Sequence, residues 1–320
     1  MTHAHEPSPD LNRLRPPAPP VSTFGGTQVL RPDVVRVRLP MVNAFLMGLP
    51  GEDWVLLDAG MPGTAGLIRK AADEYHAGRP PVATVLTHGH LDHIGALHEL
   101  LKTWQVPVYA HPLELPHLTG GAPYPFPDPT VGGTTSLLSP AFVPGPFDFR
   151  PHVQALPENG SVPHLPGWRW LHTPGHSSGH VSLWREEDRT LIAGDAVVTT
   201  KQETATGAFA LRPTLIHRPP AYYTPNWDAA RDSVRRLAAL HPHLVVTGHG
   251  HPMSGPEMEA DLGRLARNFD ELGRPRRGWY VTRPVPVGVP RIGPDPLKQR
   301  VLAAAALGAL ALVLLGRRRH

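Results

Sequence analysis

The segment that most constrains this chain is Thr87-His88-Gly89-His90-Leu91-Asp92-His93. It follows an apolar run at residues 82–86 that predicts a buried strand, and a helical pattern begins directly after it. Four potential metal ligands therefore fall within six residues. On the turn after a strand, His88 and His90 can point the same way, whereas Asp92 and His93 face a neighbouring point from the first helical turn. One segment can thus contribute to two metal sites.

Three more candidate ligands stand at the ends of later predicted strands. His176, Asp195 and His249 each directly follow a glycine, which lets the backbone bend sharply where a strand ends. A catalytic zinc ion takes about three protein ligands and keeps one open position, so two ions need such donors from distant strands. The chain has no cysteine, and any catalytic metal must therefore take nitrogen and oxygen ligands.

Strands and helices alternate in two similar halves, which predicts an α/β fold with two packed sheets and helices outside. Three apolar segments near the start predict successive antiparallel strands, at residues 34–39, 44–49 and 54–58. Helical spacing of apolar residues predicts helices around residues 67–75, 228–240 and 258–272. Further strands are expected at residues 168–172, 180–184, 190–193 and 244–247.

The expected organisation is one large domain, residues 28–273, between two tails. Residues 112–166 contain 13 prolines and are expected to form an irregular insertion that could cover a site. Residues 1–27 lack the pattern of a secretory signal and are expected to be a disordered, Pro-rich leader. Residues 274–296 are rich in Pro and Arg, which predicts a linker.

The final segment, residues 297–320, is expected to form an apolar helix flanked by basic residues. One interpretation is a membrane tether, although its apolar run of 15 residues, 301–315, is short for a bilayer core of roughly 30 Å. The other is a terminal helix packed on the domain. We expect a cytoplasmic protein, with membrane association through this tail as the alternative.

The net charge is only +4, from 31 Lys and Arg against 27 Asp and Glu, and its densest basic run is at the C-terminus. This balance predicts no nucleic-acid surface, because such a surface needs clustered cations. A small-molecule substrate is the expected partner, and the oligomeric state is left open.

The ligand segment has the pattern His-x-His-x-Asp-His, and residues 56–60, Leu-Leu-Asp-Ala-Gly, form a second motif. From about residue 34 to 272, the chain resembles the metallo-β-lactamase-fold hydrolases, a superfamily that includes glyoxalase II. The resemblance implies a four-layer αββα sandwich. It also implies a metal pair, with Asp195 as the bridge, one ion held by His88, His90 and His176, and the other by Asp92, His93 and His249.

Several further residues are expected to support this centre. His172 and His180 flank a ligand, His251 follows one, and Asp58 ends an apolar strand where an unpaired charge would be costly. Each is expected to orient a ligand. Tyr222 and Tyr223 are candidates for the substrate pocket.

The expected function is that of a dinuclear hydrolase. A hydroxide bridging two divalent ions, zinc in the first place with iron or manganese as alternatives, attacks an ester, thioester or lactone. Asp92 is expected to orient this hydroxide as well as to bind metal. Two alternatives remain open: a mononuclear iron dioxygenase of the same fold, and a non-catalytic, membrane-tethered binding protein.

Overall fold

The first half of the chain forms a seven-stranded sheet whose strands follow one another in sequence order. The computed structural model describes residues 23–290 and 293–317. Short loops join β1 to β4 as antiparallel neighbours, as expected, whereas longer connections make β4 to β7 parallel. The strands are β1 (Thr27–Arg31), β2 (Val34–Arg38), β3 (Asn43–Met47), β4 (Val55–Leu57), β5 (Ala83–Val85), β6 (Val108–Ala110) and β7 (Val153–Ala155).

The second sheet has five strands in the order β12-β11-β10-β9-β8. Its β10 and β11 pair parallel, and its other neighbours pair antiparallel. The strands are β8 (Trp168–His172), β9 (Val181–Arg185), β10 (Thr190–Ile192), β11 (Leu244–Val246) and β12 (Met253–Ser254).

The two sheets pack face to face through strands, such as β3, that carry apolar side chains on both sides. In β3, Leu46 belongs to the buried cluster beneath the helices, whereas the adjacent Phe45 belongs to the cluster between the sheets. Successive side chains of a strand point to opposite faces, so an unbroken apolar strand fills two layers of core. Leu183 and Val246 of the second sheet join Phe45 in the central cluster.

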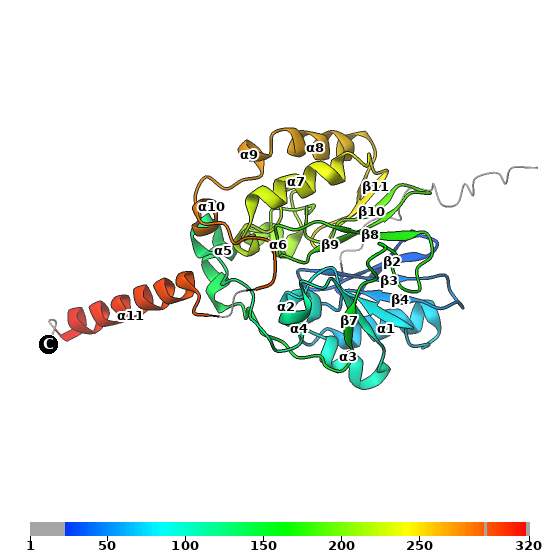
Figure 1. Ribbon diagram of the computed structural model, residues 1–320, viewed down its shortest axis with the longest axis horizontal. Helices are drawn as coiled ribbons and strands as arrows, with labels where there is room; N and C mark the ends of the chain where they lie inside the picture. Colours follow the sequence, from blue (N-terminus) through cyan, green and yellow to red (C-terminus); the bar gives the residue numbers. More distant parts are fainter. Residues whose placement is uncertain (1–22, 291–292, 318–320) are drawn as a thin grey trace, which may run out of the picture.

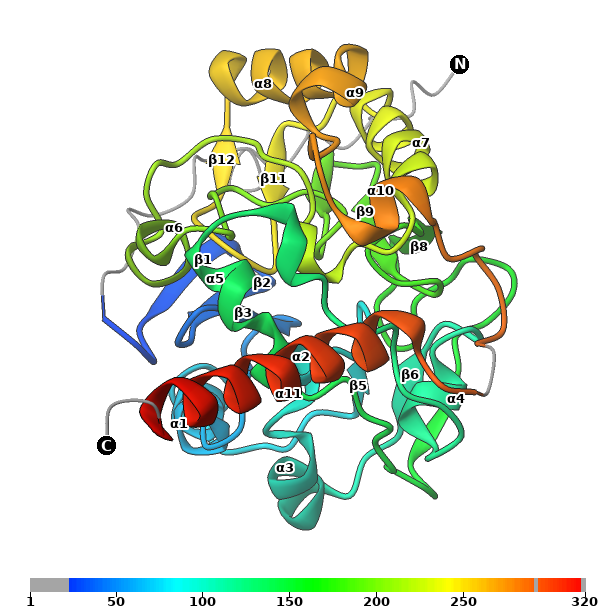
Figure 2. The same cartoon turned by 90° about the vertical axis from the view of Figure 1, so that its left-hand side faces the viewer.

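Helices cover both outer faces. Ile68 and Leu97 pack against the first sheet, and Val234 and Leu262 pack against the second. The result is the expected αββα sandwich (Figure 1), and Figure 2 gives the same layers from the side. The α-helices are α1 (Ala65–His76), α2 (Leu91–Ile94), α3 (Leu97–Trp104), α4 (Leu115–Leu118), α5 (Thr134–Leu138), α6 (Ala205–Ala210), α7 (Trp227–Ala238), α8 (Pro256–Arg267), α9 (Phe269–Leu272), α10 (Trp279–Thr282) and α11 (Pro296–Arg317).

Two segments are more structured than the sequence indicated. The insertion, residues 112–166, contains α4, α5 and two 3-10 turns, and its β7 extends the first sheet. The expected linker, residues 274–296, carries α10 and packs on this insertion, where Tyr280 is buried with Phe126 and Leu297. Burial of these apolar side chains offsets the entropy cost of ordering a Pro-rich segment.

The C-terminal helix α11 projects from the sandwich (Figure 1). Asp295 precedes it and accepts hydrogen bonds from the backbone N–H groups of Leu297 and Lys298. Across residues 23–290 and 293–317, no helix combines the length and apolar character that crossing a membrane requires. Most of the expected leader, residues 1–22, lies outside the described residues, and Thr27 already belongs to β1.

Candidate metal centre

The contiguous ligand segment lies where β5 ends and α2 begins, as expected. His88 and His90 stand on the connecting turn, and Asp92 and His93 lie in the first turn of α2. His88, His90 and His93 are almost fully buried, whereas the Asp92 side chain is 25% exposed. Asp92 is therefore the member of this segment that faces solvent.

The three distant candidates reach the same place from the second sheet. His176 follows β8, Asp195 follows β10 and His249 follows β11. Two of the preceding glycines, Gly194 and Gly248, allow neighbouring side chains to lie closer than a Cβ would permit. Gly194 has a φ of 53°, and a Cβ there would lie 2.6 Å from His180 Nε2; a Cβ at Gly248 would overlap the Asp195 carboxylate.

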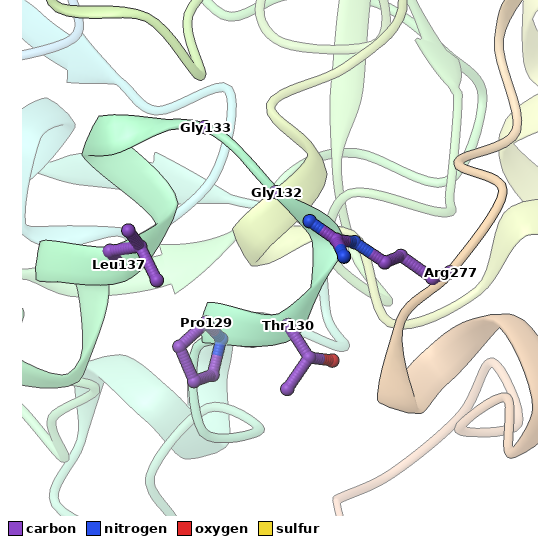
Figure 3. Close-up of a pocket in the computed structure, with 6 residues that line it drawn as sticks. All are labelled: Pro129, Thr130, Gly132, Gly133, Leu137 and Arg277. Carbon is purple, nitrogen blue, oxygen red and sulfur yellow. The ribbon is translucent and has the colours of Figure 1, made fainter.

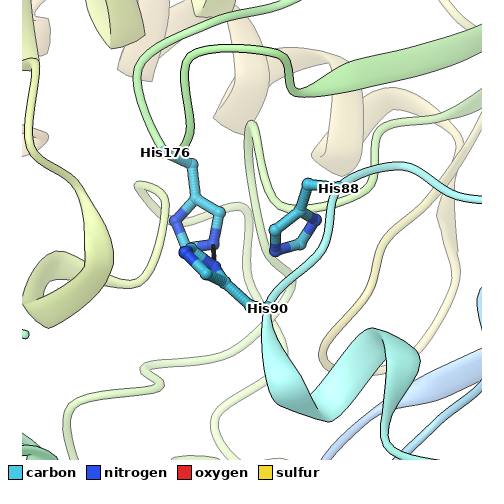
Figure 4. A group of neighbouring side chains, drawn as sticks. All are labelled: His88, His90 and His176. Atoms are coloured by element: carbon cyan, nitrogen blue, oxygen red, sulfur yellow. Dashed lines mark hydrogen bonds between the residues drawn. The ribbon is translucent and has the colours of Figure 1, made fainter. Parts of the chain in front are cut away.

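All seven predicted ligands converge. The ligand atoms of each of three groups lie within 4.8 Å of one another, and Figure 4 shows the first group. In that group His90 Nδ1 lies 3.0 Å from His176 Nε2. The groups are His88, His90 and His176; His88, His93 and Asp195; and Asp92, His93 and His249.

Asp195 stands between the two outer groups. Its Oδ2 lies 3.4 Å from His176 Nε2 on one side, and 3.0 Å from His249 Nε2 and 3.6 Å from His93 Nε2 on the other. Asp92 Oδ2 lies 3.3 Å from His249 Nε2. The carboxylate of Asp195 can therefore contact cations on both sides.

The donor atoms of the centre fit cations. Among the described residues, three of its buried atoms have no hydrogen-bond partner: His88 Nε2, His93 Nε2 and Asp195 Oδ1. Leaving such atoms unpaired costs free energy, which bound cations would remove. Imidazole nitrogen and carboxylate oxygen suit zinc, iron and manganese alike.

Hydrogen bonds to the other ring nitrogens turn the free nitrogens inward. His93 Nδ1 lies 2.8 Å from Asp58 Oδ2, and His249 Nδ1 lies 2.6 Å from the Met41 carbonyl oxygen. Asp58 is an acceptor, so Nδ1 of His93 carries a proton, whereas Nδ1 of His249 also lies 2.7 Å from Gln202 Nε2. Burial alone would lower the pKa of both rings, but Asp195 and the neighbouring carboxylates raise it. A cation bound by Nε2 would therefore displace a proton from these rings.

Burial and mutual repulsion keep the three-histidine group neutral. Burial and the neighbouring imidazoles hold the pKa of His88 and of His90 well below the usual range, and burial lowers the pKa of His176 to about 4. Burial alone would raise the pKa of Asp195, but His249 and His93 hold it well below the usual range. Neutral imidazoles beside an ionised carboxylate are in the protonation states that bind metal.

Two of the four expected supporting residues contact the ligands. Asp58 binds His93 directly, and it accepts hydrogen bonds from the backbone N–H and the hydroxyl of Thr87. His180 Nε2 accepts a hydrogen bond from the backbone N–H of Asp195 at 2.8 Å. Both therefore orient the ligand set, by different routes.

The other two point elsewhere. His172 donates to the Ser178 carbonyl oxygen and stacks on His111, with ring centroids 4.2 Å apart. His251 lies near arginines, and burial together with the charges of Arg36 and Arg38 lowers the pKa of His251 to about 4. Nearness in the sequence is therefore not enough to place a side chain against the ligands.

Tyr223 contacts a candidate ligand, whereas Tyr222 packs against Tyr223. Tyr223 stacks on His90 with ring centroids 4.3 Å apart. Tyr222 is buried behind it, with ring centroids 5.3 Å from Tyr223 and 5.8 Å from Phe142. Burial, with the charge of Asp92 next, raises the pKa of both tyrosines, so both hydroxyls are neutral.

Sequence reasoning missed the buried carboxylate Glu114 and its partner Tyr124. Glu114 lies in the Pro-rich insertion and accepts hydrogen bonds from Gly89 and Tyr124, and the Tyr124 ring packs edge-on against His90. One signal was available: Glu114 is the only acidic residue between Glu99 and Asp128, within a largely apolar stretch. An isolated carboxylate in such a stretch needs a polar partner.

A cavity of about 420 Å³ opens away from this centre, beside the 3-10 turn at Pro129–Val131 (Figure 3). The cavity is lined by Pro129, Thr130, Gly132, Gly133, Leu137 and Arg277. None of these is a candidate ligand, and Arg277 is the one charged side chain among them. The cavity therefore does not include any of the seven candidate ligands.

Comparisons with known proteins agree with this geometry. The chain is 45% identical over 236 residues to the probable metallo-hydrolase YflN of Bacillus subtilis (72% of this chain, 89% of the relative). It is 30% identical over 216 residues to the probable metallo-hydrolase YybB of the same organism (68% and 83%). A beta-lactamase domain protein from Burkholderia ambifaria shares the fold, with a TM-score of 0.55, 23% identity and 79% of each chain covered.

The family profile described as "Metallo-beta-lactamase superfamily" matches residues 37–249, a range that includes all seven candidate ligands. This membership and the metallo-hydrolase relatives support a metal-dependent enzyme with a divalent metal site. The chain belongs to the metallo-beta-lactamase superfamily.

Proposed function

We propose that this protein is a dinuclear metal-dependent hydrolase of small acyl substrates, namely esters, thioesters or lactones. The observation that carries the proposal is the convergence of seven side chains, with three buried ligand atoms that lack any hydrogen-bond partner among the described residues. The relationship to two probable metallo-hydrolases supports the reaction class.

In this proposal His88, His90 and His176 hold one ion, and Asp92, His93 and His249 hold the other. Asp195 would contribute to holding both ions, because its Oδ2 lies close to histidines of both groups. Zinc is the expected metal, and iron and manganese accept the same donors. When bound, the two divalent ions would supply hydroxide near neutral pH and would polarise a substrate carbonyl.

The protein's own residues orient the reactants. Asp92 is the solvent-facing carboxylate of the centre, and the carboxylate oxygen that does not hold the metal can accept a hydrogen bond from the attacking water. Asp58 holds the ring of His93 through its Nδ1–H group, and the Met41 carbonyl oxygen and Gln202 Nε2 both lie against Nδ1 of His249. The rings of Tyr223 and Phe142 provide an apolar wall beside His90, suited to the carbon skeleton of a small substrate.

The test combines metal analysis with a substrate panel. Purified protein should contain two divalent ions per chain and should hydrolyse at least one class among thioesters, lactones and simple esters. A single iron with visible absorption and oxygen uptake would favour the dioxygenase alternative. Full hydrolase activity in protein stripped of metal would refute the proposal.

A further inference from the structure

Glu114 is a fully buried carboxylate whose two oxygens accept four hydrogen bonds. Its Oε2 accepts from the Gly89 backbone N–H at 3.0 Å and from the Tyr124 hydroxyl. Its Oε1 accepts from the Ser177 hydroxyl at 2.7 Å and from the Gly179 backbone N–H at 2.8 Å. All four donors are uncharged groups, so the carboxylate serves as an acceptor for backbone and hydroxyl groups.

These donors belong to the two loops that carry the three-histidine group. Gly89 stands between His88 and His90, and Ser177 directly follows His176. The approach is close: a Cβ at Gly179 would lie 2.8 Å from Glu114 Oε1, and a Cβ at Gly89 would overlap the Tyr124 hydroxyl. One side chain of the insertion therefore ties together two loops that come from different sheets.

Asp58 is a second buried carboxylate outside the ligand set, and it touches both groups, because the Thr87 hydroxyl that it binds lies 3.1 Å from His88 Nδ1. It binds the Thr87 backbone N–H and hydroxyl at 2.8 Å each, and His93 Nδ1 at 2.8 Å. The centre thus has two buried carboxylates outside its ligand set. Asp58 contacts His93 directly. Glu114 instead binds Gly89, Ser177 and Gly179, which belong to the loops that carry His88, His90 and His176.

We propose that Glu114 is a positioning residue for the metal site of His88, His90 and His176, and that it sets the affinity of this site independently of the other. The inference rests on the metal pair of the proposed function. Binding a metal requires three nitrogens in one geometry, and a tie between the two loops removes the freedom that would spread them.

The substitution Glu114→Gln tests this role at nearly constant shape. The amide replaces one oxygen by an NH2 donor, and either orientation places that donor against a backbone N–H, of Gly89 or of Gly179. A hydroxyl can rotate to accept, but a backbone N–H cannot. One of the two loops therefore loses its tie.

The experiment is a titration of metal-free protein with Zn²⁺ in competition with a chromophoric chelator, which resolves two dissociation constants. His176→Ala identifies the step that belongs to the three-histidine group. Glu114→Gln should weaken the same step by about 10- to 100-fold and leave the other within about twofold. Asp58→Asn is the comparison: it alters the acceptor of His93 Nδ1 and should weaken the other step more than the step of the three-histidine group.

Unchanged constants in Glu114→Gln would overturn the inference, and so would equal weakening of both steps. Circular dichroism and thermal unfolding of the metal-free variant check that it folds. If it does not fold, Tyr124→Phe and Ser177→Ala each remove one donor while keeping the carboxylate. These two variants should then weaken the same step, and an unchanged step in both overturns the proposal.

The same titration separates this inference from the proposed function. Wild-type protein that binds two ions but hydrolyses none of the substrates refutes the hydrolase while leaving the role of Glu114 to stand or fall on the constants. Wild-type protein that does not bind two ions refutes both.

Discussion

The two halves of the sandwich contribute to the candidate centre in opposite ways. The first half, β1 to β7, provides four ligands from one segment of six residues, His88 to His93. The second half, β8 to β12, provides three ligands from three separate loops, each after a different strand. The geometry of the first set is local, since a turn and one helical turn impose it. The second set depends on strand pairing across the whole second sheet.

The halves are joined at the loop of His249. The Asn43 side chain donates to the carbonyl oxygens of Thr247 and Gly250, and the Asn43 backbone N–H donates to Gly248. The loop of His249 thus rests on β3 of the first sheet. The position of His249 consequently depends on contacts with the other half.

The largest expected effect comes from the ligand that touches both groups. Asp195→Ala should lower kcat/KM by about 10³-fold, equivalent to several kcal/mol of transition-state stabilisation, and should reduce the metal content. Metal analysis and steady-state kinetics measure both. Asp148→Ala is the control, because Asp148 is exposed and pairs with Arg150 on the surface. Wild-type turnover in Asp195→Ala would show that the halves do not share a centre.

The contact between the halves at Asn43 should give the next largest effect. Asn43→Ala removes the amide that binds Thr247 and Gly250, and it deprives the buried Arg36 of an acceptor at 2.8 Å. The free energy of unfolding should fall by about 2–3 kcal/mol, as measured by urea unfolding. Asn159→Ala, which loses only exposed local hydrogen bonds to Ser161, should stay within about 0.5 kcal/mol. Equal losses in the two variants would contradict this role.

A second link between the halves depends on pH. Asp188 binds Arg31 of β1 and Arg185 of β9. Burial alone would raise the pKa of Asp188, but hydrogen bonds from Arg185 bring it below the usual value. The stability that Asp188 contributes is therefore present above about pH 4 and is lost as the pH falls through the lowered pKa.

Asp188→Asn should accordingly cost about 1–2 kcal/mol of unfolding free energy at neutral pH. The difference from wild type should shrink in acid, as urea unfolding at a series of pH values would measure. A difference in unfolding free energy that grows towards low pH would contradict the stabilising role of the ionised Asp188.

The smallest effect is expected at Tyr223. Its ring, rather than its hydroxyl, contacts His90, with an interplanar angle of 23°. Tyr223→Phe keeps that ring and should change metal affinity by less than about twofold. Tyr223→Ala removes the ring and should have the larger effect in the same titration. A large loss of kcat in Tyr223→Phe with intact metal binding would instead assign chemistry to the hydroxyl.

The contrast between the halves also explains which residues could be predicted. The strands near residues 34–58 follow from apolar runs separated by turns, and the ligand set follows from donors that recur after glycines at strand ends. These are short-range patterns. His172 and His251 stand near ligands in the sequence, but His172 hydrogen-bonds to the Ser178 carbonyl oxygen and His251 feels the charges of Arg36 and Arg38.

The sequence by itself determined the alternation of strands and helices and the chemistry of the donors, because period and spacing act over a few residues. Only the tertiary structure decided that Asn43 supports the loop of His249 and that Glu114 ties the loops of His90 and His176. Such contacts join residues tens to hundreds of positions apart, and their free energy depends on burial and hydrogen-bond geometry, which no local pattern encodes.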